Sequence, residues 1–273
     1  MTDLPVRMLA LDMDGTLLRS DETISPRNQA AVAACLERDI AVVLATGRFY
    51  PGVTPYLNCW PGSPIWVAAC NGALLYAPGE DEPFSTRVVD PSLARAVVAW
   101  AGAQGVYVKV YVDDLVLVNR MTEETRAFMR RYGPRVRVER DLAAALQRGA
   151  AKILLFADVN EIPALEREVC ARWGAGLEVT GSEPYVLELT APGATKGDAL
   201  RTLAERLGID RRQVAAIGNE RNDLSMILWA GRGATVQNAN AAVREVAPRV
   251  VGHHDADGVA EFIESFLAPP GAV

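Results

Sequence analysis

Residues 8–18 read MLALDMDGTLL, an apolar run that ends in two aspartates, Asp12 and Asp14, one residue apart. Uninterrupted apolar residues favour a strand that is buried on both faces, as in a parallel sheet covered by helices. Two carboxylates this close repel each other, and burial adds to that cost. We therefore expect a metal ion, a substrate or both to lie between them.

The composition is that of an ordinary globular protein. The chain has 273 residues, of which 50% are hydrophobic and 23% charged, and its formal net charge is -6. This length suits one large domain or two modest ones. The negative charge argues against nucleic acid as a partner. Because the chain opens without a secretory signal and lacks an apolar stretch of roughly 20 residues, we expect a cytoplasmic protein with no membrane contact.

Apolar runs alternate with helical patterns at both ends of the chain. The predicted strands cover residues 6–12, 40–46, 65–70 and 213–217, and the predicted helices cover 25–39, 196–207, 223–230 and 257–267. Buried strands separated by helices are typical of a parallel sheet with helices on both faces. The predicted fold class is therefore α/β, with a Rossmann-like parallel-sheet core.

The middle of the chain has a different pattern. Residues 106–112 and 115–119 alternate between apolar and polar side chains, and Asp113-Asp114 joins them. That pattern indicates an antiparallel hairpin with one exposed face. We predict that residues 83–190 form a second, α+β domain, inserted into a discontinuous core domain made of residues 1–82 and 191–273.

Several polar residues are expected to meet at one edge of the core sheet. Asp12, Thr46 and the segment GNERND (218–223) each follow a predicted parallel strand, and Lys196 opens a predicted helix. Ligands bind beyond the carboxyl ends of the strands in such sheets. Carboxylates, a hydroxyl, an ammonium group and an Asn/Asp-rich loop together suit phosphoryl transfer assisted by Mg2+.

These segments resemble the haloacid dehalogenase superfamily, and within it the Cof-type phosphatases, which carry a large inserted cap domain. The resemblance covers nearly the whole chain and rests on DMDGT (12–16), ATGR (45–48), TKGDAL (195–200) and IGNERNDLSMI (217–227). The predicted insertion lies between the second and third of these motifs, where this subgroup keeps its cap.

The resemblance implies a role for each motif residue. Asp12 would be the nucleophile that forms an aspartyl-phosphate, and Asp14 would act as general acid and then general base. Lys196 would offset the negative charge of Asp12 and of the phosphate. The phosphate-binding residues would be Gly15, Thr46, Gly47 and Asn222.

The implied Mg2+ site departs from the family pattern at one position. Its ligands would be the Asp12 carboxylate, the Asp14 backbone carbonyl and residue 219, where the family usually has Asp and this chain has Asn219. An amide oxygen can bind Mg2+ but carries no charge, so weaker metal binding is expected. Asp223 would compensate, either directly or through water. Our hypothesis is an active enzyme that needs more Mg2+.

The expected activity is Mg2+-dependent hydrolysis of small phosphomonoesters, either sugar phosphates or phosphorylated cofactors. Phosphomutase chemistry is an alternative, and Asn219 leaves open a catalytically weakened protein that binds phosphorylated ligands. The expected partner is a small phosphorylated molecule, and the protein would be a monomer or a homodimer.

Three other polar residues have more than one interpretation. Arg48 could face the substrate or form a salt bridge, and Asn71 could face the substrate or belong to a turn. Glu188 could support the site from a distance or be an ordinary strand residue.

Overall fold

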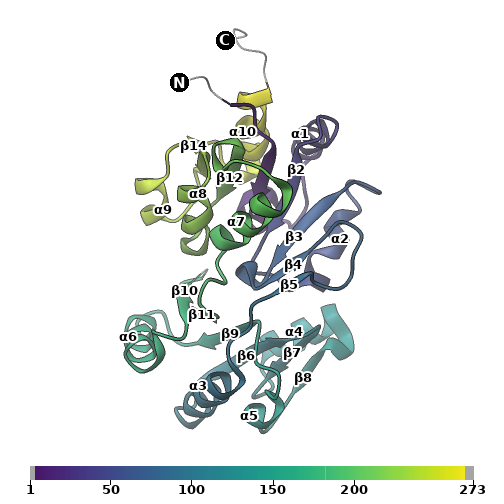
Figure 1. Ribbon diagram of the computed structural model, residues 1–273. Helices are drawn as coiled ribbons and strands as arrows, with labels where there is room; N and C mark the ends of the chain where they lie inside the picture. Colours follow the sequence, from purple (N-terminus) through teal and green to yellow (C-terminus); the bar gives the residue numbers. More distant parts are fainter. Residues whose placement is uncertain (1–3, 182, 268–273) are drawn as a thin grey trace.

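The computed structural model describes residues 4–181 and 183–267, which form two sheets flanked by helices (Figure 1). The strands of the larger sheet are β1 (Met8–Leu11), β2 (Ala41–Ala45), β3 (Ile65–Ala69), β4 (Leu74–Tyr76), β5 (Ser85–Thr86), β12 (Val214–Gly218), β13 (Arg232–Val236) and β14 (Val250–Val251). Their order is β14-β13-β12-β1-β2-β3-β4-β5. All neighbours from β14 to β3 are parallel, whereas β4 and β5 add an antiparallel edge.

Helices cover both faces of this sheet. They are α1 (Pro26–Leu36), α2 (Thr54–Leu57), α7 (Lys196–Leu207), α8 (Leu224–Trp229), α9 (Ala241–Val246) and α10 (Gly258–Leu267). The chain crosses from β1 to β2 in one direction and from β12 to β13 in the other. Because such crossovers are right-handed, α1 and α8 lie on opposite faces. The direction changes between β12 and β1, and the crevice at such a point is where ligands bind in this architecture.

The smaller sheet is mainly antiparallel. Its strands are β6 (Tyr107–Val112), β7 (Leu115–Val118), β8 (Val136–Val138), β9 (Lys152–Phe156), β10 (Glu178–Thr180) and β11 (Val186–Thr190), in the order β10-β11-β9-β6-β7-β8. Its helices are α3 (Pro91–Ala103), α4 (Glu123–Tyr132), α5 (Leu142–Ala145) and α6 (Ile162–Trp173). Asp113 takes the left-handed backbone conformation that a tight hairpin needs, with a φ of 51°.

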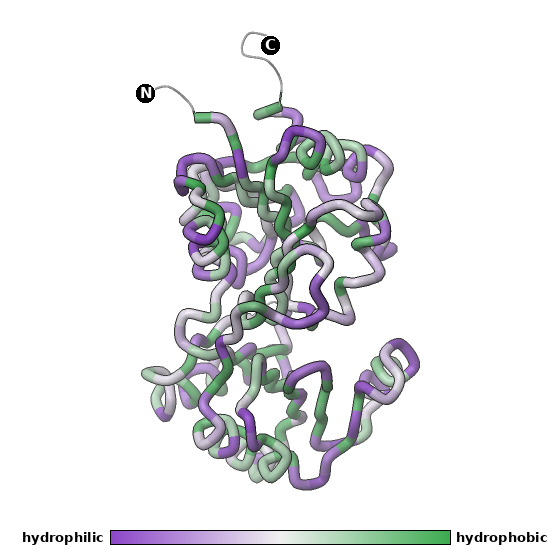
Figure 2. The backbone as a smooth tube through the Cα atoms, turned by 45° about the vertical axis from the view of Figure 1, so that its right-hand side comes forward, coloured by the Kyte–Doolittle hydropathy of each residue, from purple (hydrophilic) through white to green (hydrophobic). Residues whose placement is uncertain are grey.

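The predicted α/β fold class is confirmed, and the hairpin joined by Asp113-Asp114 is present. The sequence did not reveal the antiparallel edge strands β4 and β5, because runs of two or three residues carry too little periodicity. Hydrophobic residues concentrate in the central strands of the larger sheet (Figure 2). Among the described residues, no helix is long and apolar enough to cross a membrane.

Gly72 fixes the distance between two segments that support the site. It has a φ of 94°, and a Cβ atom at this position would lie 2.5 Å from the carbonyl oxygen of Thr195 and 2.8 Å from Cβ of Ala199. Thr195 caps α7 by accepting a hydrogen bond from the backbone N–H of Asp198. Close contact at Gly72 therefore sets where α7 begins, and with it the position of Lys196.

Substituting Gly72→Ala is expected to lower the free energy of unfolding by about 2 kcal/mol or more, because the new methyl group meets backbone and the φ is unfavourable. Urea denaturation measures this change. Gly79→Ala is the matched control, since Gly79 has a φ of 78° but no atom within 4 Å of a built Cβ. Equal losses in the two variants would contradict the role given to the contact with Thr195.

Candidate active site

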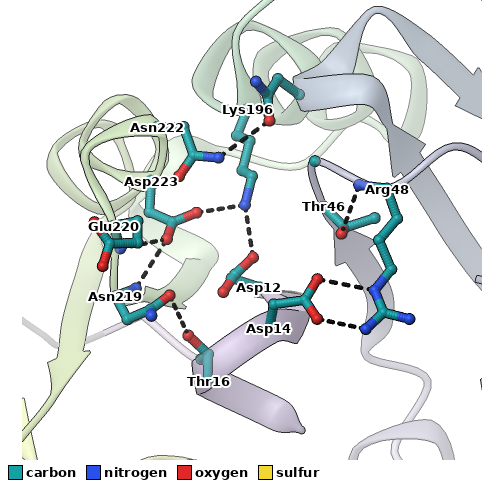
Figure 3. Close-up of polar contacts among 12 residues, drawn as sticks. Asp12, Asp14, Thr16, Thr46, Arg48, Lys196, Asn219, Glu220, Asn222 and Asp223 are labelled. Carbon is teal, nitrogen blue, oxygen red and sulfur yellow. Dashed lines mark hydrogen bonds and ion pairs between the residues drawn. The ribbon is translucent and has the colours of Figure 1, made fainter. Parts of the chain in front are cut away.

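The carboxyl ends of three neighbouring strands bring the predicted site residues together. Asp12 follows β1, Thr46 follows β2 and Asn219 follows β12, while Lys196 is the first residue of α7. Their side chains converge in one region (Figure 3). Gly15, with a φ of 71°, allows the chain to turn directly after the two aspartates.

A buried ammonium group joins the aspartates of the first and fourth motifs. Nζ of Lys196 donates hydrogen bonds to Oδ1 of Asp12 at 2.7 Å and to Oδ1 of Asp223 at 2.5 Å. The lysine is only 1% exposed. Burial disfavours its charged form, but the two carboxylates outweigh this effect and raise the pKa of Lys196 above its usual range. Lys196 is therefore held as a cation.

The contact with Lys196 does not fully compensate the negative charge of Asp12 and Asp223. Burial, together with the negative charge of Asp223, raises its pKa to about 7, and Lys196 offsets only part of that shift. One cation shared by two carboxylates leaves the pair negative overall. A further cation beside Asp12 would stabilise its ionised form.

Asp14 is turned toward Arg48 and away from Lys196 (Figure 3). Nε of Arg48 donates to Oδ2 of Asp14 at 2.8 Å, and its Nη2 donates to Oδ1 at 2.5 Å. Burial opposes the charge on Arg48, but the hydrogen bonds and charge of Asp14 prevail and raise the pKa of Arg48. Of the two interpretations of Arg48, the salt bridge is present in this structure.

Asp223 organises the loop of the fourth motif. Its Oδ2 accepts hydrogen bonds from the backbone N–H groups of Asn219 at 2.8 Å and Glu220 at 2.9 Å, while its Oδ1 binds Lys196. Both carboxylate oxygens are therefore engaged. Direct metal binding by Asp223 would require one of these contacts to open.

Most of the predicted site residues border one cavity of about 550 Å3. Asp12, Asp14, Gly15, Gly47, Asn219 and Asn222 line it. Thr46 is fully buried next to Gly47 and its Oγ1 accepts a hydrogen bond from the backbone N–H of Arg48 at 3.1 Å. Lys196 and Asp223 lie behind Asp12 and reach the cavity through it.

Side chains from the smaller sheet, from α4 and from the turn before β11 form the opposite wall of the cavity. They are mainly aromatic or charged: Lys109, Tyr111, Glu124, Phe128, Tyr132, Lys152, Phe156, Tyr185 and Glu188. The motifs did not identify this wall. Period-two alternation in β6, β9 and β11 was the available signal, but it does not say which face of a sheet meets another domain.

The sequence pattern of the haloacid dehalogenase-like hydrolase family matches residues 9–263. The chain belongs to this family. It is 26% identical to the phosphatase YwpJ of Bacillus subtilis, over 96% of this chain and all of that protein. It is also 26% identical to the pyridoxal phosphate phosphatase YbhA of Escherichia coli, over 97% of this chain and all of that protein.

A solved structure gives the same result. The chain superimposes on a haloacid dehalogenase-like hydrolase from Bacteroides thetaiotaomicron with a TM-score of 0.82 and 30% identity, over 95% of this chain and 99% of the other. The predicted membership of the haloacid dehalogenase superfamily is confirmed, and this chain is an enzyme of the hydrolase type.

The amide of Asn219 decides whether the hydrolase can hold a metal as the family pattern suggests. Its Oδ1 accepts a hydrogen bond from Oγ1 of Thr16 at 3.0 Å, but the same atom also faces two acceptors, the Asp14 carbonyl oxygen and Oδ2 of Asp12. With the amide turned over, the nitrogen donates to these atoms at 3.1 Å and 3.0 Å. The nitrogen orientation therefore suits a site without a cation.

The oxygen orientation suits a hard cation. Adjacent oxygens around an octahedral Mg2+ with bonds of about 2.1 Å lie about 3 Å apart. The amide end of Asn219 has that spacing from Oδ2 of Asp12 and from the Asp14 carbonyl oxygen. The donor set thus fits Mg2+, provided that the amide presents its oxygen.

Replacing Lys196 should show how strongly the buried ion pair supports this hydrolase. Lys196→Met leaves Asp12 and Asp223 buried without their shared cation, so the free energy of unfolding is expected to fall by about 3–5 kcal/mol. Arg27→Met is the control, because Arg27 pairs with Glu264 at 2.6 Å on the surface. That loss should stay below about 1 kcal/mol. Urea denaturation of both variants at neutral pH measures the difference, and similar losses would refute the argument.

Proposed function

We propose that the protein is a Mg2+-dependent phosphatase that hydrolyses small phosphomonoesters through an aspartyl-phosphate on Asp12. The observation that carries the proposal is the position of Asp12, which borders the cavity while Lys196 binds it from behind. A carboxylate held in this way is exposed to a ligand on one side only, as a nucleophile requires.

The reaction has two displacement steps. A carboxylate oxygen of Asp12 attacks phosphorus, and the bond from phosphorus to the leaving alcohol oxygen breaks. Asp14 transfers a proton to that oxygen, so the alcohol leaves neutral. Asp14 then takes a proton from water, whose oxygen attacks phosphorus, and inorganic phosphate leaves as Asp12 is regenerated.

Asp14 must be free to exchange protons for this sequence to run. In the structure Arg48 binds both of its carboxylate oxygens. We propose that this salt bridge belongs to the substrate-free state. A phosphate group near Arg48 would compete for the guanidinium group, because a phosphate dianion carries more charge than a carboxylate and also accepts two parallel hydrogen bonds from arginine, and Asp14 would be released.

The remaining motif residues would bind the phosphate and the metal. Gly47 and Asn222 line the same cavity as Asp12 and would bind the phosphate together with the neighbouring Thr46, while Lys196 would supply positive charge. Asp12, the Asp14 carbonyl and the Asn219 amide oxygen would hold Mg2+, with Asp223 acting through the backbone of residue 219. The bound ion would neutralise charge on the reacting phosphate.

The opposite wall of the cavity would contact the leaving group of the substrate. We propose that residues 83–190 act as a cap, because every strand of the smaller sheet and α3 to α6 fall in this range. The wall carries the rings of Tyr111, Phe128, Tyr132, Phe156 and Tyr185. Aromatic walls favour flat, apolar ring faces. Since the similar protein YbhA acts on pyridoxal phosphate by name, we favour phosphorylated cofactors with a planar ring over sugar phosphates.

A panel of metabolite phosphates, assayed with and without Mg2+, tests the proposed activity. Wild-type protein is expected to release inorganic phosphate. Phosphates of cofactors with a planar ring should be turned over faster than hexose phosphates. Asp12→Asn should lower kcat at least about 1000-fold, because the amide is a poor nucleophile. Undiminished turnover in that variant would exclude the aspartyl-phosphate. Isomerised sugar phosphate in place of released phosphate would indicate a mutase.

Asn219 provides the test of metal use. Asn219→Asp adds a negative charge beside Asp12, so the Mg2+ concentration for half-maximal activity is expected to fall about tenfold or more. A Mg2+ titration of activity in both proteins measures this shift, with calorimetric Mg2+ binding as a second readout. Identical Mg2+ dependence of the two proteins would show that residue 219 is not a Mg2+ ligand. Micromolar phosphate binding without turnover at saturating Mg2+ would favour a binding protein instead.

A further inference from the structure

A chain of hydrogen-bonded polar side chains, three of them buried and the last half-buried, connects the smaller sheet to the segments that would hold phosphate. It begins at Lys152 on β9 and Glu188 on β11, whose side chains contact Gly47 and Asn71, the residues that follow two strands of the larger sheet. It continues through Asn71, which follows β3, and ends at Asn222 in the fourth motif. The catalytic steps above assign no role to the first three of these residues.

Lys152 brings a positive charge from the smaller sheet to the second motif. Its Nζ donates a hydrogen bond to the carbonyl oxygen of Gly47 at 2.6 Å and forms a salt bridge with Glu188 at 3.3 Å. The residue is 2% exposed. A Cβ atom built on Gly47 would lie 3.2 Å from this Nζ and 3.9 Å from Nδ2 of Asn222. The ammonium group therefore lies beside the backbone that would surround the phosphate.

Glu188 determines which way two amides point. A carboxylate accepts hydrogen bonds and cannot donate them, so Asn71 turns its nitrogen toward Glu188, with Nδ2 at 2.5 Å from Oε2. Oδ1 of Asn71 then faces Asn222 and accepts a hydrogen bond from its Nδ2 at 3.1 Å. An amide nitrogen has two N–H groups, so the second one of Asn222 remains for a phosphate oxygen.

The backbone at the centre of this chain is strained. Cys70 and Asn71 have φ values of 51° and 62°, and Gly72 follows with 94°. Consecutive non-glycine residues in the left-handed region each cost about 1 kcal/mol or more, and such strain clusters at functional sites. The strained turn places the Asn71 amide between Glu188 and Asn222.

We propose that Lys152 and Glu188 are positioning residues through which the smaller sheet sets the affinity of the site for phosphate. This inference rests on the proposed phosphatase function. Lys152 fixes the Gly47 carbonyl and adds positive charge, and Glu188 orients the Asn222 amide through Asn71. Phosphate affinity would then depend on contact between the two sheets, even for substrates whose leaving groups are too small to reach the aromatic wall.

Binding of inorganic phosphate to the full-length protein, measured by calorimetry with Mg2+ present, tests the role of Lys152. Lys152→Met is expected to weaken binding about tenfold or more, Lys152→Gln by a similar factor, and Lys152→Arg by less than about threefold, because arginine keeps the charge. With a small aryl phosphate, the first two variants should raise KM more than they lower kcat. If Lys152→Met does not fold, the phosphate affinity of Lys152→Gln decides the test.

Arg95→Met is the control for loss of a positive charge from the same part of the chain. Arg95 lies on α3, is half-buried and donates a hydrogen bond from Nη1 to the carbonyl oxygen of Leu146 at 3.1 Å, and it does not line the cavity. The phosphate affinity of Arg95→Met should stay within about twofold of wild type. The inference is overturned if Lys152→Gln also stays within that range, or if Arg95→Met loses as much affinity.

Asn71→Gly tests the amide chain without adding strain, because glycine adopts a φ of 62° freely. We expect phosphate binding to weaken about fivefold or more as Asn222 loses its orienting partner. Asp39→Gly is the control, since Asp39 has a φ of 56° and lies outside the cavity. Unchanged phosphate binding in Asn71→Gly would refute the role given to the hydrogen bonds that link Glu188, Asn71 and Asn222. Because binding is measured directly, this result stands apart from whether the wild-type protein hydrolyses phosphomonoesters.

Discussion

The buried contact of Lys196 with Asp12 and Asp223 is the interaction on which the rest of the site depends. It joins the end of β1, the start of α7 and the loop after β12, three segments far apart in sequence. Burying two ionised carboxylates this close is costly without a shared cation. Asp223 extends the contact by binding the backbone of Asn219 and Glu220, so one ammonium group orders most of the cavity floor.

The topology explains why this contact can form and why it faces a second sheet. Strand order reverses between β12 and β1, which opens a crevice where Asp12 and Asn219 meet. The smaller sheet then covers that crevice with the face that carries Lys109, Lys152 and Glu188. The floor carries the carboxylates and the smaller sheet carries aromatic and charged groups, so under the proposed function chemistry and selectivity would come from different parts of the chain.

Sequence reasoning was most successful in predicting which short motifs the fold brings together. Asp12 and Lys196 meet as expected, because each stands at the end of a strand or the start of a helix, and α7 has the predicted bounds. It was least successful for the covering sheet. Asn71 and Glu188 are 117 residues apart, and only the tertiary fold shows that they share a hydrogen bond. Alternating strands do not reveal which face becomes buried against a neighbour.

The charge of the site gives Asn219 a physical meaning beyond weaker metal binding. Asp12, Asp14 and Asp223 are opposed by Lys196 and Arg48, which leaves one negative charge on this group of five residues. A divalent cation would make the group positive by one charge, whereas an aspartate at position 219 would make it neutral. A phosphate dianion is attracted more strongly to the positive site. Under the proposed function, the asparagine would therefore exchange affinity for the metal against affinity for the phosphate, and Lys152 would add to that attraction from the opposite wall.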